Sequence, residues 1–355
     1  MKTLIIDFSP ILYRFLFASS TRYANTKGVT VEENGLLDFS KYKDVYVYLI
    51  LNDLSKMKNR FGADEVVIAC DTGPYWRKTG AGDHSGYSRY KYGRGKDDDK
   101  NVIDWAASKN AQNELIDVLK ENSTFKVIAK RSIEGDDTLF VLAEELSKRG
   151  HEVVCKSLDH DIYYTLEHEN VQYWQTKHTT QNKKCGFVEM TPKEIQEEKY
   201  YHILLGDPGD GFLHSKSWTV FSDEFLSLYP GKTPLQVWAK RHEIDIAFQA
   251  KHKDDFPDVK NLSAWKHPKF GRKTFQKKLD SGKITLESFL AENPIHQLNY
   301  NLNETLAMPY KIPKEIRQCI IDEYNETPCD LKPLGLNEYF NANSLFSLFG
   351  KAGLF

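Results

Sequence analysis

The stretch TLIIDFS, residues 3–9, ends an apolar run typical of a buried strand in an aspartate, Asp7. The stretch EVVIACDTG, residues 65–73, repeats this order with Asp71. Further segments have the apolar, β-branched composition of strands: Phe125–Ala129, Glu152–Lys156 and Val171–Gln175. These patterns predict a set of strands, two of which end in a carboxylate.

Helical patterns lie between those strands. They cover Tyr42–Phe61, Val102–Asn122, Asp136–Arg149 and a short segment after Asp161. Strands that alternate with helices predict an α/β fold with a mainly parallel central sheet flanked by helices. Functional groups in such folds gather beyond the carboxyl ends of the strands. We therefore expect Asp7 and Asp71 to lie close together.

Two segments interrupt this alternation. Residues 72–100 are too long for a simple connection and form either a functional excursion above the sheet or a mobile segment. Residues 175–186 are polar and predict a hairpin before the strand-like residues 187–190. After residue 206, short helical pieces alternate with Pro and Gly. We predict a core of residues 1–205, which includes the excursion at 72–100, and a helical, duplex-binding lobe of residues 206–355 with a hydrophobic C-terminal tail.

The composition is that of an ordinary soluble globular protein. Of the 355 residues, 40% are apolar and 28% are charged, and the formal net charge is −2. The five cysteines form no CxxC pair, which fits a reducing cytosol. Asp7 and Arg14 interrupt the first apolar stretch, which argues against a signal peptide. No apolar run reaches the roughly 18–20 residues of a membrane span, so we expect a cytoplasmic monomer without membrane contact.

Acidic residues concentrate in five short motifs: IIDFS, ACDTG, IEGDD, SLDHD and GDPGD. The motifs supply Asp7, Asp71, Glu134, Asp136, Asp137, Asp159, Asp161, Asp207 and Asp210. Mg²⁺ prefers oxygen ligands, and two ions about 3.5–4 Å apart can stabilise the attacking and leaving oxygens of a phosphoryl displacement. The alternative is that these acids cap helices and turns, which capping alone explains for Asp136 and Asp137. Taken together, the motifs predict an Mg²⁺-dependent enzyme that acts on phosphodiesters and accepts Mn²⁺ as a substitute.

Residues 72–100, here called the basic arch, interleave cations with aromatic rings. The side chains that we expect to contact nucleic acid are Arg77, Lys78, Arg89, Tyr90, Lys91, Arg94 and Lys96. Such surfaces bind single strands because cations follow the backbone and rings stack on bases. The alternative is a solvated loop whose aromatic rings pack locally. A second basic stretch, which contains Arg272 and Lys273, either grips duplex phosphates or is the charged face of a helix.

The five acidic motifs and the basic arch occur in the order found in the flap endonuclease, or 5′-nuclease, family, which the chain resembles. The likeness is greatest to the branch that contains the RNase H of T-even phages. It extends through YWRK and RYKYGRGK in the arch and returns at YKIPKEIRQCIIDEYN and LFGKAGL near the C-terminus. The resemblance implies a PIN-like nuclease core, primer removal during replication and, for a phage protein, the host cytoplasm.

The resemblance also assigns roles to individual residues. A tighter metal site matches Asp7, Asp71, Glu134, Asp136 and Asp159, and a second site matches Asp161, Asp207 and Asp210. Asp137 takes a supporting place beside them. Lys91 and Arg94 match the basic residues that face the scissile phosphate, where they would neutralise charge in the transition state.

One departure from the family concerns the grip on duplex DNA. The family follows its last acidic motif with a Gly-rich helix–hairpin–helix, whereas here GDPGD continues as GFLHSKSWTVF. The departure leaves the duplex grip unassigned and makes Asp207 a weaker candidate than Asp210. The tail SLFSLFGKAGLF either packs on the helical lobe or docks on a sliding clamp or a single-stranded-DNA-binding protein.

We expect the substrates to be DNA and RNA·DNA hybrids with 5′ ends or flaps. Two other functions remain open: a PIN-type ribonuclease acting on single-stranded RNA, and a non-catalytic factor that binds branched DNA. No GxGxxG or GxxxxGK[ST] motif is present, which argues against nucleotide hydrolysis, and the histidines lack zinc-ligand spacing.

Overall fold

The computed structural model describes residues 1–26, 28–29, 31–32, 34–81, 87, 90–91, 102–178, 183–207, 210, 230–231, 272–292, 294–327 and 331–355, without the side chains of residues 176–185, 294 and 295. Two compact units share these residues. Unit 1 consists of Met1–Tyr75, Asp98–Thr191 and Lys314–Phe355, and unit 2 of Trp76–Asp97 and Pro192–Pro313.

Unit 1 is built around one sheet. Its strands are β1 (Lys2–Asp7), β2 (Glu65–Ala69), β3 (Lys126–Ile128), β4 (Glu152–Ser157), β5 (Val171–His178) and β6 (Lys183–Val188). The strand order is β3-β2-β1-β4-β5-β6; β6 pairs with β5 antiparallel, and the other pairs are parallel. The prediction of an α/β fold with a mainly parallel sheet is confirmed, including the hairpin that β5 and β6 form.

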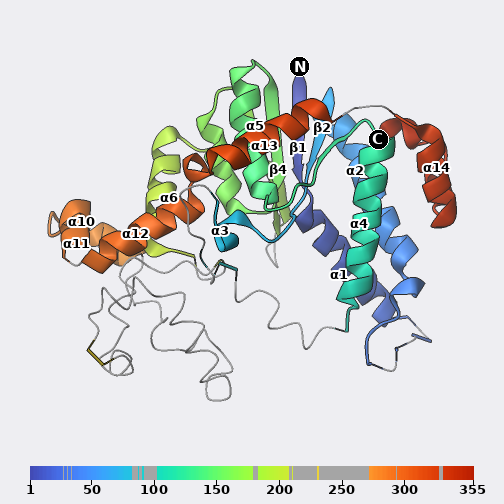
Figure 1. Ribbon diagram of the computed structural model, residues 1–355, viewed down its shortest axis with the longest axis horizontal. Helices are drawn as coiled ribbons and strands as arrows, with labels where there is room; N and C mark the ends of the chain where they lie inside the picture. Colours follow the sequence, from blue (N-terminus) through green and yellow to red (C-terminus); the bar gives the residue numbers. More distant parts are fainter. Residues whose placement is uncertain are drawn as a thin grey trace. The chain divides into compact units, whose positions relative to one another are not determined.

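Helices cover both faces of this sheet. The helices of unit 1 are α1 (Ser9–Ala24), α2 (Lys43–Phe61), α4 (Trp105–Asn122), α5 (Gly135–Lys148), α13 (Lys314–Glu326) and α14 (Pro333–Ala342). Figure 1 shows α1, α2 and α4 on one side of β1 and β2, and α5 and α13 on the other. Leu4 and Ile6 of β1 join the core beneath α1, α2 and α4. Because Ile5 is also fully buried, β1 has apolar contacts on both faces, as central parallel strands do.

Local signals explain where most of these helices begin and end. Asp104 caps α4, accepting a hydrogen bond from Ala107 N (2.9 Å), and α2 ends at Gly62, whose positive φ of 60° suits a glycine. Helix α1 was not predicted, because its apolar residues continue directly from the strand that ends at Asp7. Ile11, Leu12 and Leu16 nevertheless have helical spacing and are buried.

The C-terminal segment belongs to unit 1 rather than to the helical lobe. Leu336, Phe340, Leu348 and Phe355 are buried in the same core cluster as β1 and β2. Phe355 O accepts hydrogen bonds from the backbone and the side chain of Thr124 (2.8 and 2.6 Å). The predicted boundary at residue 206 and the predicted packing of the tail on the helical lobe are therefore wrong for Lys314–Phe355.

Unit 2 is helical in its described part. Its helices are α3 (Trp76–Thr79), α6 (Pro192–Leu205), α10 (Arg272–Asp280), α11 (Leu286–Ala291) and α12 (Pro294–Ala307). Tyr201 and Leu204 of α6 pack with Phe275 of α10 and with Phe289 and Leu290 of α11. Among the residues that the structure describes, no helix combines the length and the apolar character that a membrane crossing requires.

Candidate metal centre and nucleic-acid contacts

The acidic motifs of unit 1 follow strands that are neighbours in the sheet. Asp7 ends β1, Asp71 follows β2 by two residues, and Asp159 follows β4 by two residues. Strand β1 lies between β2 and β4, and the chain proceeds outward from β1 in both directions. The acids thus border the point at which the strand order reverses, where open α/β sheets commonly bind ligands.

Gly135, the first residue of α5, lies between two of these carboxylates. Its amide donates a hydrogen bond to Asp71 Oδ1 (2.7 Å). A Cβ atom on Gly135 would lie 3.2 Å from Asp7 Oδ1 and 3.5 Å from Asp71 Oδ1. The two carboxylate oxygens therefore face the same small space beside the start of α5.

Asp7 and Asp159 are connected through the hydroxyl of Ser157. This hydroxyl donates to Asp7 Oδ2 (2.6 Å) and accepts from Asp159 N (3.0 Å). The Tyr173 hydroxyl donates to the carbonyl oxygen of Asp159 (2.5 Å), and Asp161 N donates to Asp159 Oδ1 (3.1 Å). The turn after β4 is thus fixed by hydrogen bonds at the backbone and side chain of Asp159.

The electrostatics confirm that the acids lie near one another. Burial, followed by the charge of Asp71 and, more weakly, that of Asp159, raises the pKa of Asp7 to about 7. Burial and then the charges of Asp159, Asp7 and Asp136 raise the pKa of the Tyr173 hydroxyl. Asp7, Asp71, Asp136 and Asp159 therefore act on a common region of unit 1.

This donor set fits a divalent cation. Asp7 is only 5% exposed, and an ionised carboxylate buried beside other acids is unfavourable unless a positive charge accompanies it. Lys156 offsets the charge of Asp7 less than any other group that acts on it, and burial lowers the pKa of Lys156 itself to about 8. Oxygen ligands without cysteine are the set that Mg²⁺ and Mn²⁺ prefer.

The other acids of the IEGDD motif differ in their surroundings. Asp137 is fully buried, and its Oδ2 accepts a hydrogen bond from Glu134 N (3.2 Å) as part of a capping box at the start of α5. Glu134 is 1% exposed, whereas Asp136 is partly exposed. The capping bond agrees with the supporting place predicted for Asp137 and gives it a structural role of its own.

Asp207 and Asp210, the acids of the GDPGD motif, belong to unit 2 together with Lys91 of the arch. Lys91 N donates to the carbonyl oxygen of Asp210 (2.9 Å). The φ of Lys91 is 53°, an uncommon conformation for a residue with a side chain, and its Nζ lies 5.0 Å from the centre of the Tyr90 ring. The predicted phosphate-facing lysine is thus held beside a predicted metal ligand within one unit.

Two arch residues are placed differently from the prediction. Arg77 is 4% exposed, and its Nε donates to the carbonyl oxygen of Leu306 in α12 (2.6 Å). Tyr90 is likewise 4% exposed. These side chains pack inside unit 2, as the alternative of local packing expected, so they do not present the surface for nucleic acid that was predicted. Lys78 is exposed; Arg89, Arg94 and Lys96 lie outside the described residues.

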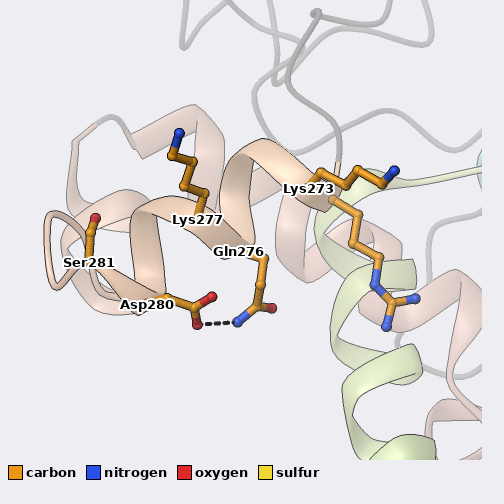
Figure 2. A pocket seen from close by; sticks show the side chains of 6 residues that line it. Lys273, Gln276, Lys277, Asp280 and Ser281 are labelled. Carbon is orange, nitrogen blue, oxygen red and sulfur yellow. Dashed lines mark hydrogen bonds between the residues drawn. The ribbon is translucent and has the colours of Figure 1, made fainter.

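Helix α10 carries the second basic stretch on an open, pocketed surface (Figure 2). Lys273 and Lys277 project from the same side of the helix, one turn apart, while Gln276 Nε2 donates to Asp280 Oδ1 (2.6 Å) on the other side. Arg272 pairs with Glu198 and lies over the Tyr201 ring (4.4 Å). Arg272 therefore joins α10 to α6, and Lys273 and Lys277 are the cations that this helix exposes.

Sequence reasoning missed Ser157, Gly135 and Tyr173. Gly135 and Ser157 were inside or beside motifs that we quoted, but neither is a charged group, and Tyr173 was hidden in a strand pattern. The available signal was position: Ser157 is the last residue of the strand that precedes SLDHD, and a polar side chain at the carboxyl end of a buried strand needs a partner.

Comparison with known proteins agrees with the fold and the order of the motifs. The chain belongs to the 5′-3′ exonuclease family: the family model described as 5′-3′ exonuclease, N-terminal resolvase-like domain, matches residues 2–200, more than half of the chain. The resemblance to the 5′-nuclease family is thereby confirmed.

Individual relatives include the Ribonuclease H of Enterobacteria phage T4. It is 29% identical over 193 residues, and the alignment covers 53% of this chain and 58% of the phage T4 protein. The chain thus matches less than two thirds of that relative's length. A T5 5′-exonuclease with bound zinc has 12% identity and a TM-score of 0.48, covering 93% of this chain and 100% of that one. A T5 flap endonuclease with DNA and metal ions has 13% identity and a TM-score of 0.45, covering 92% and 100%.

Proposed function

We propose that this protein is a divalent-metal-dependent 5′-nuclease. It hydrolyses phosphodiesters near the 5′ ends of RNA·DNA and DNA duplexes and at 5′ flaps, and it removes primers during replication. The observation that carries this proposal is the meeting of Asp7, Asp71 and Asp159 at the carboxyl ends of three adjacent strands, in a chain of the 5′-3′ exonuclease family.

The carboxylates of unit 1 would hold Mg²⁺, for which Mn²⁺ would substitute. Bound divalent ions supply activation of the attacking water and neutralisation of charge on the leaving oxygen. The chain's own contribution is to orient the ligands: Gly135 N binds Asp71, and Ser157 binds Asp7. Asp136, partly exposed at the start of α5, and Glu134 complete the proposed set for the tighter site, and Asp161, Asp207 and Asp210 that for the second.

Nucleic acid would be bound by cations of both units. Lys91, together with Arg94 as predicted, would face the scissile phosphate, and exposed Lys78 would contact the single strand. Lys273 and Lys277 of α10 would contact duplex phosphates (Figure 2). The predicted contact with a sliding clamp or a single-stranded-DNA-binding protein would use Phe346 and Phe349, which are 60% and 43% exposed.

Cleavage of a 5′-flap duplex in Mg²⁺ tests the proposal directly. The wild type is expected to release short products with 5′-phosphates. Asp71→Asn should lower the rate at least about 100-fold, because losing a ligand removes several kcal/mol of stabilisation and each 1.4 kcal/mol is about tenfold. Asp117→Asn, which changes an exposed acid of α4 in the same way, should leave the rate unchanged.

The outcomes also distinguish the alternatives. Cleavage of plain single-stranded RNA without regard to 5′ ends would favour a PIN-type ribonuclease. A mobility shift on forked DNA without product, in Mg²⁺ and in Mn²⁺, would favour a non-catalytic binding factor and contradict the proposal.

A further inference from the structure

Ser157 lies where the ends of β1 and β4 come together. The last register pair of these strands is Ile6 with Lys156, so Ser157 and Asp7 are the next residues on adjacent strands. Ser157 is 4% exposed, and a serine hydroxyl has a single hydrogen to donate. That hydrogen goes to the Asp7 carboxylate rather than to a backbone carbonyl.

We propose that Ser157 is a positioning residue for the metal centre: its hydroxyl fixes the rotation of the Asp7 carboxylate and connects it to the backbone of Asp159. This inference rests on the proposed function, since it assigns Asp7 and Asp159 as ligands. It concerns a residue that touches neither the ion nor the substrate.

The hydrogen bonds show how one atom sets two ligands. Asp7 Oδ2 accepts from Ser157 (2.6 Å), so Oδ1 is the oxygen that faces Asp71 across Gly135. The same Ser157 oxygen accepts from Asp159 N (3.0 Å), and Tyr173 holds the carbonyl of Asp159 (2.5 Å). The hydroxyl of Ser157 therefore sets the position of Asp159 relative to Asp7, across the point where the strand order reverses.

Removing the hydroxyl changes both ligands at once. In Ser157→Ala, Asp7 Oδ2 and Asp159 N lose this partner, and the carboxylate can rotate. Groups that orient metal ligands in this way typically contribute 10–100-fold to metal affinity. A serine that only stabilised the turn would change the free energy of unfolding without changing the affinity for a divalent ion.

The test is a calorimetric titration of Mn²⁺ into the full-length protein without nucleic acid, below the melting temperature of each variant. Ser157→Ala should raise the Kd for Mn²⁺ about 10–100-fold, while Ser157→Thr, which keeps the hydroxyl, should stay within about threefold of the wild type. In flap cleavage, Ser157→Ala should need a correspondingly higher Mn²⁺ concentration for half-maximal rate and recover most of its kcat at saturation.

Ser123→Ala is the matched control. Ser123 is 1% exposed, and its hydroxyl also donates once, to Leu119 O (2.6 Å), and accepts once, from Phe125 N (3.1 Å). It precedes β3, so it lies at the opposite ends of the strands from the acids. We expect its loss to lower the melting temperature and leave the Kd for Mn²⁺ unchanged.

Three results would overturn the inference: a Kd for Ser157→Ala within twofold of the wild type, an equal loss in Ser123→Ala, or a folded Ser157→Thr as weak as Ser157→Ala. If the wild type takes up no Mn²⁺, the proposed function fails and this inference fails with it. If the wild type binds Mn²⁺ and Ser157→Ala binds it equally well, only the inference fails.

Discussion

Asp7 is the residue whose placement is least favourable without a partner ion. It is 5% exposed, and burial with the neighbouring acids raises its pKa to about 7. A raised pKa means that the folded state disfavours the ionised carboxylate. Such a residue reduces stability in the metal-free protein and becomes an asset only when a cation binds.

We predict that Asp7→Asn stabilises the metal-free protein at pH 8, by up to about 4 kcal/mol for a pKa shift of this size. Near pH 4 the wild-type carboxyl is largely protonated in both states, so the advantage should be small there, grow as the pH rises toward 7 and level off above it. Denaturant melts in EDTA measure this. With Mn²⁺ present, the wild type should gain stability and Asp7→Asn should not; a variant less stable than the wild type at pH 8 in EDTA would contradict the prediction.

At this scale the sequence indicated the acids but not their partners. Asp7, Asp71 and Asp159 could be predicted because each follows a recognisable strand, and parallel strands bring their ends together. Arg77 and Tyr90 could not, because alternating cations and rings have the same pattern in an exposed arch as in a packed one. Their burial depends on α12, whose Leu306 carbonyl receives the Arg77 guanidinium more than 200 residues away in sequence.

At the scale of elements, α10 is a helix whose charges divide by role. Arg272 is engaged with α6, whereas Lys273 and Lys277 extend from one side (Figure 2). We predict that Lys273→Ala with Lys277→Ala weakens duplex binding and reduces the salt dependence of log Kd by about two phosphate contacts. Binding isotherms at several salt concentrations measure this.

The control for α10 is Lys193→Ala with Lys283→Ala, which removes the same charge from other exposed sites of unit 2. It should change affinity little and leave the salt slope in place. Equal slopes for the two double variants would show that α10 makes no specific contact with the duplex.

Helix α13 is attached to the core of unit 1 by ion pairs as well as by apolar packing. Glu323 is 7% exposed and lies 2.6 Å from Lys120 Nζ and 2.9 Å from Lys130 Nζ. Burial alone raises the pKa of Glu323, but the hydrogen bonds and charges of the two lysines outweigh it and hold the pKa below its ordinary value of 4.5. The carboxylate is therefore stabilised in the folded state.

We predict that Glu323→Gln destabilises the protein at pH 7 by on the order of 1 kcal/mol, since both lysines are partly exposed and screened. A lowered folded pKa gives stability that is present above the unfolded value of 4.5 and is lost as the pH falls through the folded value. The difference between wild type and variant should thus shrink toward pH 3. Thermal melts at pH 7 and pH 3.5 measure it, and a difference that grows in acid would contradict this explanation.

Elements were predictable where periodicity and caps coincide. The helix at residues 42–61 and the strands at 65–70 and 152–156 were placed within one or two residues of α2, β2 and β4. The association of the C-terminal segment with the sheet was not predictable, because an apolar helix face shows that it is buried and does not show against which partner.

At the scale of the whole molecule, unit 1 is assembled from three separate stretches of chain. Residues 314–355 supply Leu336, Phe340 and Phe355 to the core that contains β1 and β2. We predict that a fragment of residues 1–205 lacks a cooperative thermal transition by circular dichroism, because that core is left open, and that added peptide 314–355 restores one. A fragment that melts as sharply and as high as the full chain would show that the predicted boundary was an independent folding limit.

The division of unit 1 has a consequence during synthesis. A ribosome completes β1 to β6 and must then translate the roughly 120 residues of Pro192–Pro313 before Lys314 emerges. At about 5–20 residues per second this takes roughly 6–24 s. Throughout that interval the nascent sheet and its helices await the segment that seals them, so an apolar surface is open to chaperones or to a neighbouring nascent chain.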